Sequence, residues 1–136
     1  MCRGVSLSID SVLSDLAPPA WADQIEQRLA DSGYHREVVF FHRMSRTLIL
    51  TDLIANFEPD KMPWWVQPLL KLGRVSHPDG RVPRDMAASF RKKGSHLKNL
   101  VETMMAWAPE RIILAHGRWY DRDDSTELRR AFRNLL

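Results

Sequence analysis

Residues 37–52, EVVFFHRMSRTLILTD, decide the fold of this chain. Residues 37–42 and 47–51 are mostly β-branched, aromatic or aliphatic, which is typical of strands. The four residues between them are short and polar enough to form a tight turn, so we predict an antiparallel hairpin. Because both runs are almost continuously apolar, we expect a sheet that is covered on both faces.

Upstream of the hairpin, the pattern favours a helix. Trp21, Ile25 and Leu29 are spaced four residues apart, which would place them on one stripe of a helix over residues 20–32. Gly33 comes directly after this segment, where a glycine commonly ends a helix. The spacing therefore predicts that a helix precedes the hairpin.

Downstream of the hairpin, we expect further helices and one more strand. The clearest amphipathic helix covers residues 95–108, where apolar side chains recur every three or four positions. Residues 111–115 have the composition of a buried strand. Three other helices are expected: a short one near residues 64–70, one over residues 84–93 and one that begins at Ser125. This order predicts an α/β layer fold with a β-hairpin, a later strand and about five helices.

Residues 1–18 form an expected N-terminal leader. Their amphipathic character is weak, and the pair Pro18-Pro19 would break any helix that they began. We therefore expect a weakly ordered leader over residues 1–18 and a single domain over residues 19–136.

Length and composition are those of one globular domain. The chain has 136 residues, a net charge of +3 and one cysteine, Cys2, so it cannot form an internal disulfide or a zinc site made of thiolates alone. It has no apolar run of the roughly 18 residues that a membrane span needs. Its basic residues form neither a stripe nor a known nucleic-acid-binding motif. We therefore expect a cytoplasmic protein with no membrane or nucleic-acid partner.

Two polar residues stand at the ends of predicted buried strands. Asp52 follows the second strand of the hairpin, and His116 follows residues 111–115. Ligand sites collect at the carboxyl ends of strands in α/β sheets, and carboxylate with imidazole suits zinc, iron or manganese. Gly117 would let the chain turn sharply and leave the imidazole projecting from the sheet. The alternative is that Asp52 is a turn or capping residue and His116 a hydrogen-bonded loop residue.

The same two strand ends resemble metal-binding motifs of the metallo-β-lactamase superfamily. Residues 47–52, TLILTD, are similar to the strand that ends in a metal-bridging aspartate, and residues 112–117, IILAHG, to the later strand whose histidine is the last metal ligand. Residues 37–57 more closely resemble the uncharacterised family called domain of unknown function 4336. The resemblance covers residues 19–136 and implies the C-terminal half of a metallo-β-lactamase-like αββα fold, with Asp52 and His116 as metal ligands.

The resemblance also implies that half of the metal site is missing. The superfamily's first metal motif, His-x-His-x-Asp-His, does not occur in the sequence. Full members of the family carry an N-terminal half with its own sheet and a histidine-containing turn. We therefore expect a truncated or partner-dependent half-domain with two ligands and poor affinity for zinc, iron or manganese, or with no metal.

Two functions of different kinds follow from these observations. In the first, the chain belongs to a metal-dependent hydrolase that would cleave an ester, thioester or phosphoester bond of a small molecule, and it would be inactive alone. In the second, it is a non-catalytic interaction or dimerisation module, because a sheet without its second half exposes an edge or an apolar face. The partner would be a second copy of the chain or a protein that supplies the N-terminal half.

Residues downstream of Asp52 and His116 are candidates for the cleft around the metal. Asn56 would orient Asp52, or it would cap the following loop. Trp119 would line the cleft. The pair Trp64-Trp65 would either cover the cleft or pack in the core, and core packing is the interpretation that we favour.

Residues around the first strand of the hairpin are candidates as well. His35 and His42 flank this strand and would supply a third ligand, although neither occupies a matched ligand position. For His42 we favour a role in supporting the hairpin. Ser45, with Arg43 beside it in the turn, suits either a small anion site or a solvated turn without a ligand.

Overall fold

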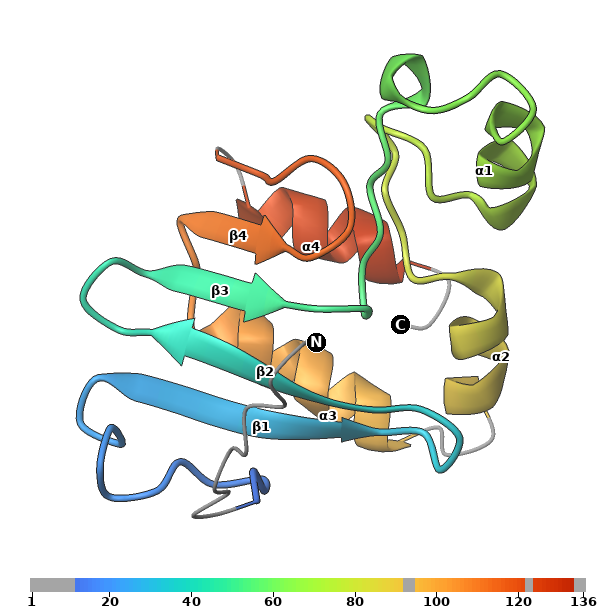
Figure 1. The fold of residues 1–136 in the computed structure, drawn as a ribbon. Coiled ribbons are helices and arrows are strands. Elements are labelled where there is room, and N and C mark those ends of the chain that lie inside the picture. Colours follow the sequence, from blue (N-terminus) through green and yellow to red (C-terminus); the bar gives the residue numbers. More distant parts are fainter. Residues whose placement is uncertain (1–11, 92–94, 122–123, 134–136) are drawn as a thin grey trace, which may run out of the picture.

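The computed structural model describes residues 12–91, 95–121 and 124–133. These residues form a mixed α/β fold around one four-stranded sheet with the order β1-β2-β3-β4 (Figure 1). β1 pairs antiparallel with β2, β2 antiparallel with β3, and β3 parallel with β4. The strands are β1 (Ile25–Asp31), β2 (Arg36–His42), β3 (Thr47–Leu50) and β4 (Arg111–Leu114).

The hairpin predicted from residues 37–52 is confirmed as β2 and β3. Phe40 pairs with Ile49 and His42 with Thr47, so the two strands run antiparallel in one register. The connecting turn closes through a hydrogen bond from the Arg46 amide to the Arg43 carbonyl. The sequence therefore predicted both the strands and the length of their connection.

The helix expected over residues 20–32 is wrong, because this segment contains β1. β1 pairs along its whole length with β2, and Gly33, with φ 85°, lies in the turn between them instead of ending a helix. Gln27 is fully buried, and its side chain bonds the Ser14 carbonyl at 2.8 Å and the Trp21 indole at 3.3 Å. Residues 25–31 pair with the edge of β2, and the backbone hydrogen bonds of this pairing outweigh the helix that the four-residue apolar spacing favours.

Four α-helices follow in the described residues, so the expected number of about five was one too high. Figure 1 shows α3 and α4 packed behind the sheet, while α1 and α2 lie beyond the ends of the strands. The helices are α1 (Gln67–Gly73), α2 (Arg84–Arg91), α3 (Ser95–Ala106) and α4 (Asp124–Phe132), with a 3₁₀ turn at Pro59–Lys61. None of the helices within the described ranges combines the length and the apolarity that crossing a bilayer requires.

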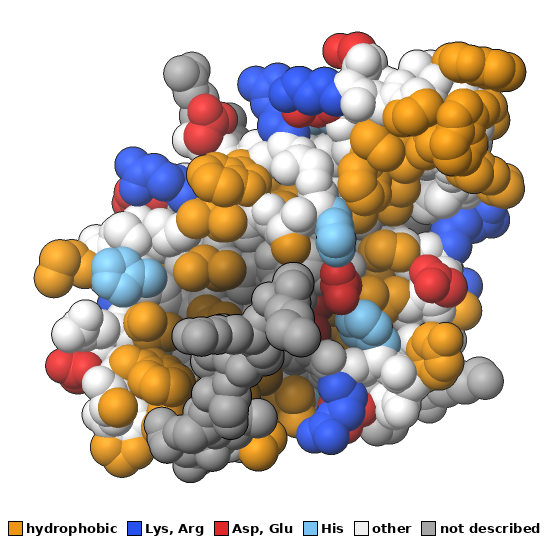
Figure 2. All heavy atoms as spheres, in the orientation of Figure 1, with side chains coloured by type: hydrophobic (Ala, Val, Ile, Leu, Met, Phe, Trp, Pro, Cys, Tyr) orange, Lys and Arg blue, Asp and Glu red, His pale blue; other side chains and the backbone are white. Residues whose placement is uncertain are grey.

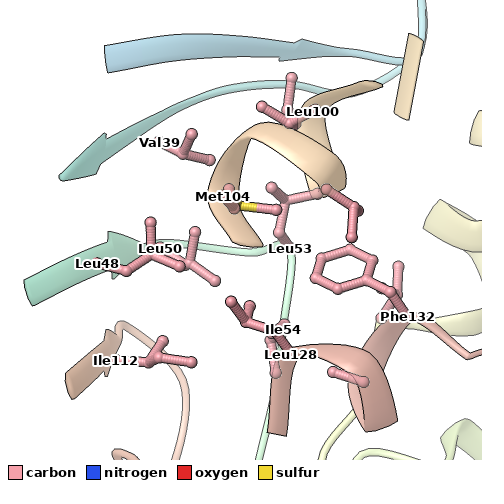
Figure 3. Close-up of a cluster of buried hydrophobic side chains, with 14 of the residues drawn as sticks. Val39, Leu48, Leu50, Leu53, Ile54, Leu100, Met104, Ile112, Leu128 and Phe132 are labelled. Atoms are coloured by element: carbon pink, nitrogen blue, oxygen red, sulfur yellow. The ribbon is translucent and has the colours of Figure 1, made fainter. Parts of the chain in front are cut away.

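The core lies between the sheet and the layer of α3 and α4 (Figure 3). Val39, Leu48 and Leu50 are almost completely buried on the sheet side. The helices contribute the residues that repeat at three- and four-residue spacing, as predicted. Those that Figure 3 labels are Leu100, Met104, Leu128 and Phe132.

The second face of the sheet differs from the prediction of a sheet covered on both sides. Val38, Phe40, Ile49 and Ile113 alternate with the core residues and are only half-buried. No helix of the described residues lies in front of this face in Figure 1. Strand burial thus alternates along the hairpin, although its sequence is apolar at nearly every position.

Part of the expected N-terminal leader lies along β1. Residues 1–11 are outside the described residues, but residues 12–18 can be followed. The Asp15 carboxylate accepts a hydrogen bond from the Leu29 amide at 2.9 Å. With the Ser14–Gln27 bond, this contact attaches the described part of the leader to the outer edge of the sheet.

Candidate functional site

The candidate site lies at the edge of the sheet where β3 and β4 end. Because these strands are parallel neighbours, with Leu50 opposite Leu114, the residues that follow them emerge side by side. The structure brings Asp52 and His116 together: His116 Nε2 lies 2.8 Å from Asp52 Oδ1. The two residues that the sequence singled out, 64 positions apart, therefore form a direct hydrogen bond.

A third side chain, His35, faces the other oxygen of the Asp52 carboxylate. His35 comes just before β2, and since β2 is antiparallel to β3, its start shares an edge with the end of β3. His35 Nε2 lies 3.5 Å from Asp52 Oδ2. This nitrogen is buried and has no hydrogen-bond partner within the described ranges. Asp52 thus stands between two imidazoles, with one oxygen toward each.

Glu37 holds the turn that carries Asp52. Its side chain is buried, and its two oxygens accept three backbone hydrogen bonds of 2.7–2.9 Å, from the amides of Thr51, Asp52 and Leu53. Burial raises the pKa of the Glu37 carboxyl, and these hydrogen bonds act in the opposite direction. The Thr51 hydroxyl adds a side-chain hydrogen bond, so the carboxylate uses all of its roughly four acceptor positions.

His35, Glu37 and Asp52 form a group that could hold a metal ion. Each offers one donor atom, and these atoms all lie within 4.8 Å of one another. The donors are one imidazole nitrogen and two carboxylate oxygens, which suit zinc, iron or manganese. His116 adjoins this group through its bond to Asp52.

Gly117 and Asn56 fix the loop that carries His116. Gly117 has φ 96°, and a Cβ atom there would lie 2.0 Å from the Asn56 carbonyl oxygen, so only glycine fits. The Asn56 amide donates to the His116 carbonyl, and the buried Asn56 side chain donates to the Arg118 carbonyl at 2.9 Å. Asn56 therefore positions the His116 loop, whereas we had expected it to orient Asp52 or to cap a loop.

Three of the other predicted cleft residues lie apart from this group. His42, Arg43 and Ser45 belong to the opposite end of the hairpin, where His42 Nδ1 lies 2.7 Å from Ser45 Oγ. Ser45 Oγ also contacts Thr47 Oγ1 at 2.8 Å, so these polar groups satisfy one another within the turn. Trp119 is half-exposed and donates its indole N–H to the Leu114 carbonyl.

An open apolar cleft of about 760 Å³ adjoins the candidate site. His35, Asp52 and His116 line it together with residues of α1, α2 and the segments between them. In Figure 2, histidine and acidic side chains meet at the border of an extensive apolar area that lies over α1. The remaining lining residues are Ala55, Phe57, Leu69, Leu72, Gly73, Val75, Pro83, Arg84, Asp85 and Met86.

The tryptophan pair before α1 does not pack in the core, so the interpretation that we favoured is wrong. Trp64 is 82% exposed and Trp65 61% exposed. β3 ends at Leu50, and the chain that follows packs in a separate small cluster around Leu70 and Val75, which includes neither tryptophan. Both tryptophans therefore lie on the surface, and neither is among the described residues that line the cleft.

Sequence reasoning assigned no role to Glu37 and left His35 without a matched position. The hairpin register contains the missing signal, because extending it by three pairs beyond Phe40 and Ile49 places Glu37 opposite Asp52. A buried glutamate opposite a strand-ending aspartate indicates a shared polar site. The burial of Glu37, however, depends on the tertiary fold.

Comparisons with known proteins give no match. No protein-family model matches the chain, and neither a curated protein nor a solved structure does.

Proposed function

We propose that His35 and Asp52 bind one divalent metal ion, while Glu37 holds the turn that carries Asp52. The observation that carries this proposal is the buried His35 Nε2, which has no hydrogen-bond partner in the described part of the chain and lies 3.5 Å from Asp52 Oδ2. Leaving a buried polar atom unpaired costs about 1–3 kcal/mol. A bound cation would remove this cost. Zinc, iron and manganese fit the donor set.

His116 has a different role in this proposal. Its Nε2 lies at hydrogen-bonding distance from Asp52 Oδ1, and an ionised carboxylate only accepts hydrogen bonds, so His116 donates through Nε2–H. In that tautomer the nitrogen has no free lone pair for a metal. His116 is therefore a positioning residue that orients Asp52, a role that commonly changes metal affinity about 10- to 100-fold.

The activity that we propose is metal-dependent hydrolysis of an ester, thioester or phosphoester. A metal at this position would act as a Lewis acid that polarises the carbonyl or phosphoryl oxygen and makes water a better nucleophile. Asp52 would anchor the ion, His116 would hold the carboxylate, and Glu37 would fix the turn. The resemblance of the two strand ends to the metallo-β-lactamase superfamily supports this reaction class, and the chain would represent the C-terminal half of that αββα fold.

Metal binding by the purified full chain tests the proposal. After dialysis, zinc, iron and manganese are measured, and zinc binding is then titrated by calorimetry for the wild type and for His35→Ala. His42→Ala is the matched control, because His42 lies at the other end of the hairpin. The proposal predicts one ion per chain, lost in His35→Ala and kept in His42→Ala. A wild-type protein that binds none of the three metals would rule it out.

A second candidate function, self-association, is favoured by the half-covered face of the sheet. Val38, Phe40, Ile49 and Ile113 place four partly exposed apolar side chains on one face of three adjacent strands. Apolar faces of this kind favour association, here with a second copy or a partner that supplies the N-terminal half. Light scattering after size exclusion tests it: we expect a dimer that Phe40→Asp dissociates, and a wild-type monomer would contradict it.

A further inference from the structure

The cleft beside the candidate site has two chemically different parts. One part is polar and consists of the His35–Asp52–His116 group. The other is mostly apolar, and the Phe57 ring joins the two, with its centroid 6.0 Å from that of His116. A molecule that occupies the cleft therefore has to present a polar group and an apolar group next to each other.

We infer that the cleft binds an amphiphilic ester or thioester, with its apolar acyl chain against α1 and its carbonyl group at the His35–Asp52–His116 group. The identity of the acyl chain rests on the cleft alone, whereas the position of the carbonyl rests on the proposed metal-dependent hydrolase. The inference thus names a substrate class for the same site.

The exposed leucines of α1 are the first reason for an apolar chain. Leu69 is 58% and Leu72 65% exposed, and both line the cleft. When a ligand removes apolar side chains in an open cleft from water, the free energy falls, and this favours binding. The volume of about 760 Å³ is in the range of pockets that bind small organic molecules.

The shortage of hydrogen-bonding groups in the apolar part is the second reason. Outside the polar group, the only charged lining residues are Arg84 and Asp85 among those that the structure describes. Arg84 already donates to the Leu72 carbonyl at 3.2 Å. A sugar or a nucleotide would leave several of its polar groups unpaired against leucine, valine and phenylalanine, which costs about 1–3 kcal/mol for each group. An acyl chain has no such groups.

The reaction of such a substrate consumes one water molecule. The water oxygen forms a bond to the acyl carbon, and the bond from that carbon to the alcohol oxygen or thiol sulfur breaks. The departing oxygen or sulfur takes one proton, and the products are a carboxylic acid and an alcohol or a thiol. Neither an oxidant nor a reductant is needed.

Binding of unreactive 1-alkanols tests the inference without requiring any turnover. The neutral fluorophore N-phenyl-1-naphthylamine is bound to the full 136-residue chain, and 1-butanol, 1-hexanol, 1-octanol and 1-decanol are used to displace it. We expect saturable displacement whose affinity rises about three- to fourfold for each buried methylene. The double variant Leu69→Asp/Leu72→Asp should weaken decanol binding at least about tenfold. Both residues are exposed, so the fold should tolerate the change.

Two controls separate this inference from the metal proposal. Met44→Asp changes an exposed apolar residue outside the cleft, and it should leave decanol affinity unchanged. Removing zinc with a chelator should keep decanol affinity within about twofold, since every side chain of the cleft stays in place. If decanol binding fails while zinc still binds, the substrate class is wrong and the metal site stands.

Three results would overturn the inference: no saturable binding, affinity that is independent of chain length, or full decanol affinity in the leucine double variant. In the third case, loss of binding in Trp64→Ser would show that the ligand lies on the exposed tryptophans instead. Circular dichroism and urea unfolding of each variant exclude loss of the fold as the cause.

Discussion

The two ends of the β2–β3 hairpin each carry a histidine, but the two imidazoles have different surroundings. At the turn end, His42 Nδ1 lies 2.7 Å from Ser45 Oγ, which in turn contacts Thr47, so the polar groups there satisfy one another. At the open end, His35 Nε2 is buried with no hydrogen-bond partner among the described residues and faces Asp52. The comparison teaches that a buried nitrogen without a hydrogen bond, and not the mere presence of a histidine near a strand, marks the candidate site.

The largest expected effect comes from the glycine that shapes the open end. Gly117→Ala places a methyl group 2.0 Å from the Asn56 carbonyl oxygen at φ 96°, so it should destabilise the fold by about 4 kcal/mol and weaken the His116–Asp52 contact. Urea unfolding measures the loss. In the matched control, Gly73→Ala, the new Cβ meets only Val75 at 3.5 Å, and the stability should change by less than about 1 kcal/mol. Equal losses in both variants would contradict this account of the His116 loop.

The next effect concerns the glutamate that holds the Asp52 turn. Glu37→Gln replaces one acceptor oxygen by a donor, so at least one of the three amide bonds is lost, and we expect a destabilisation of about 2 kcal/mol at pH 7. The same variant should bind zinc more weakly, because the Asp52 turn would no longer be fixed. Urea unfolding and zinc titration measure the two effects. Unchanged stability would show that the three bonds do not hold the turn.

Glu37 also predicts a pH dependence with a definite sign. Because burial raises its pKa above 4.5, the folded protein keeps this proton at pH values where the unfolded chain has lost it. The contribution of Glu37 to stability is therefore greatest below pH 4.5 and falls as the pH rises through the folded-state pKa. Urea unfolding from pH 4 to pH 7 should show this component in the wild type and not in Glu37→Gln. The opposite slope would mean that the three amide bonds outweigh burial.

The smallest effect is expected at the turn end. Ser45→Ala removes the hydroxyl that contacts His42 and Thr47, which should cost about 1 kcal/mol in urea unfolding. Zinc affinity should stay at the wild-type value, because the turn is at the far end of the hairpin from Asp52. Weaker zinc binding in this variant would mean that the turn end of the hairpin affects the metal site at the open end, which would contradict the comparison.

The sequence predicted the parts of the fold that depend on local residue pattern. It did not predict the parts that depend on contacts between distant segments. The hairpin, α3 and β4 followed from composition and spacing. The meeting of Asp52 with His116 depends on the parallel pairing of β3 with β4, which the local pattern does not specify. β1 was mistaken for a helix because its apolar spacing fits both structures, and only pairing with β2 distinguishes them. That His35 Nε2 is buried without a hydrogen bond could not be predicted from the sequence, since it depends on which side chains surround the nitrogen after folding.

Calorimetric titration of the full chain with zinc at pH 7 tests the central claim most directly. The account predicts one ion per chain for the wild type and at least about a 100-fold loss of affinity in both His35→Ala and Asp52→Ala. His116→Ala should lose about 10- to 100-fold, as expected for a residue that positions the carboxylate, and His42→Ala should bind like the wild type. Wild-type affinity in His35→Ala would contradict the account, because the metal would then not be held at the buried nitrogen of His35.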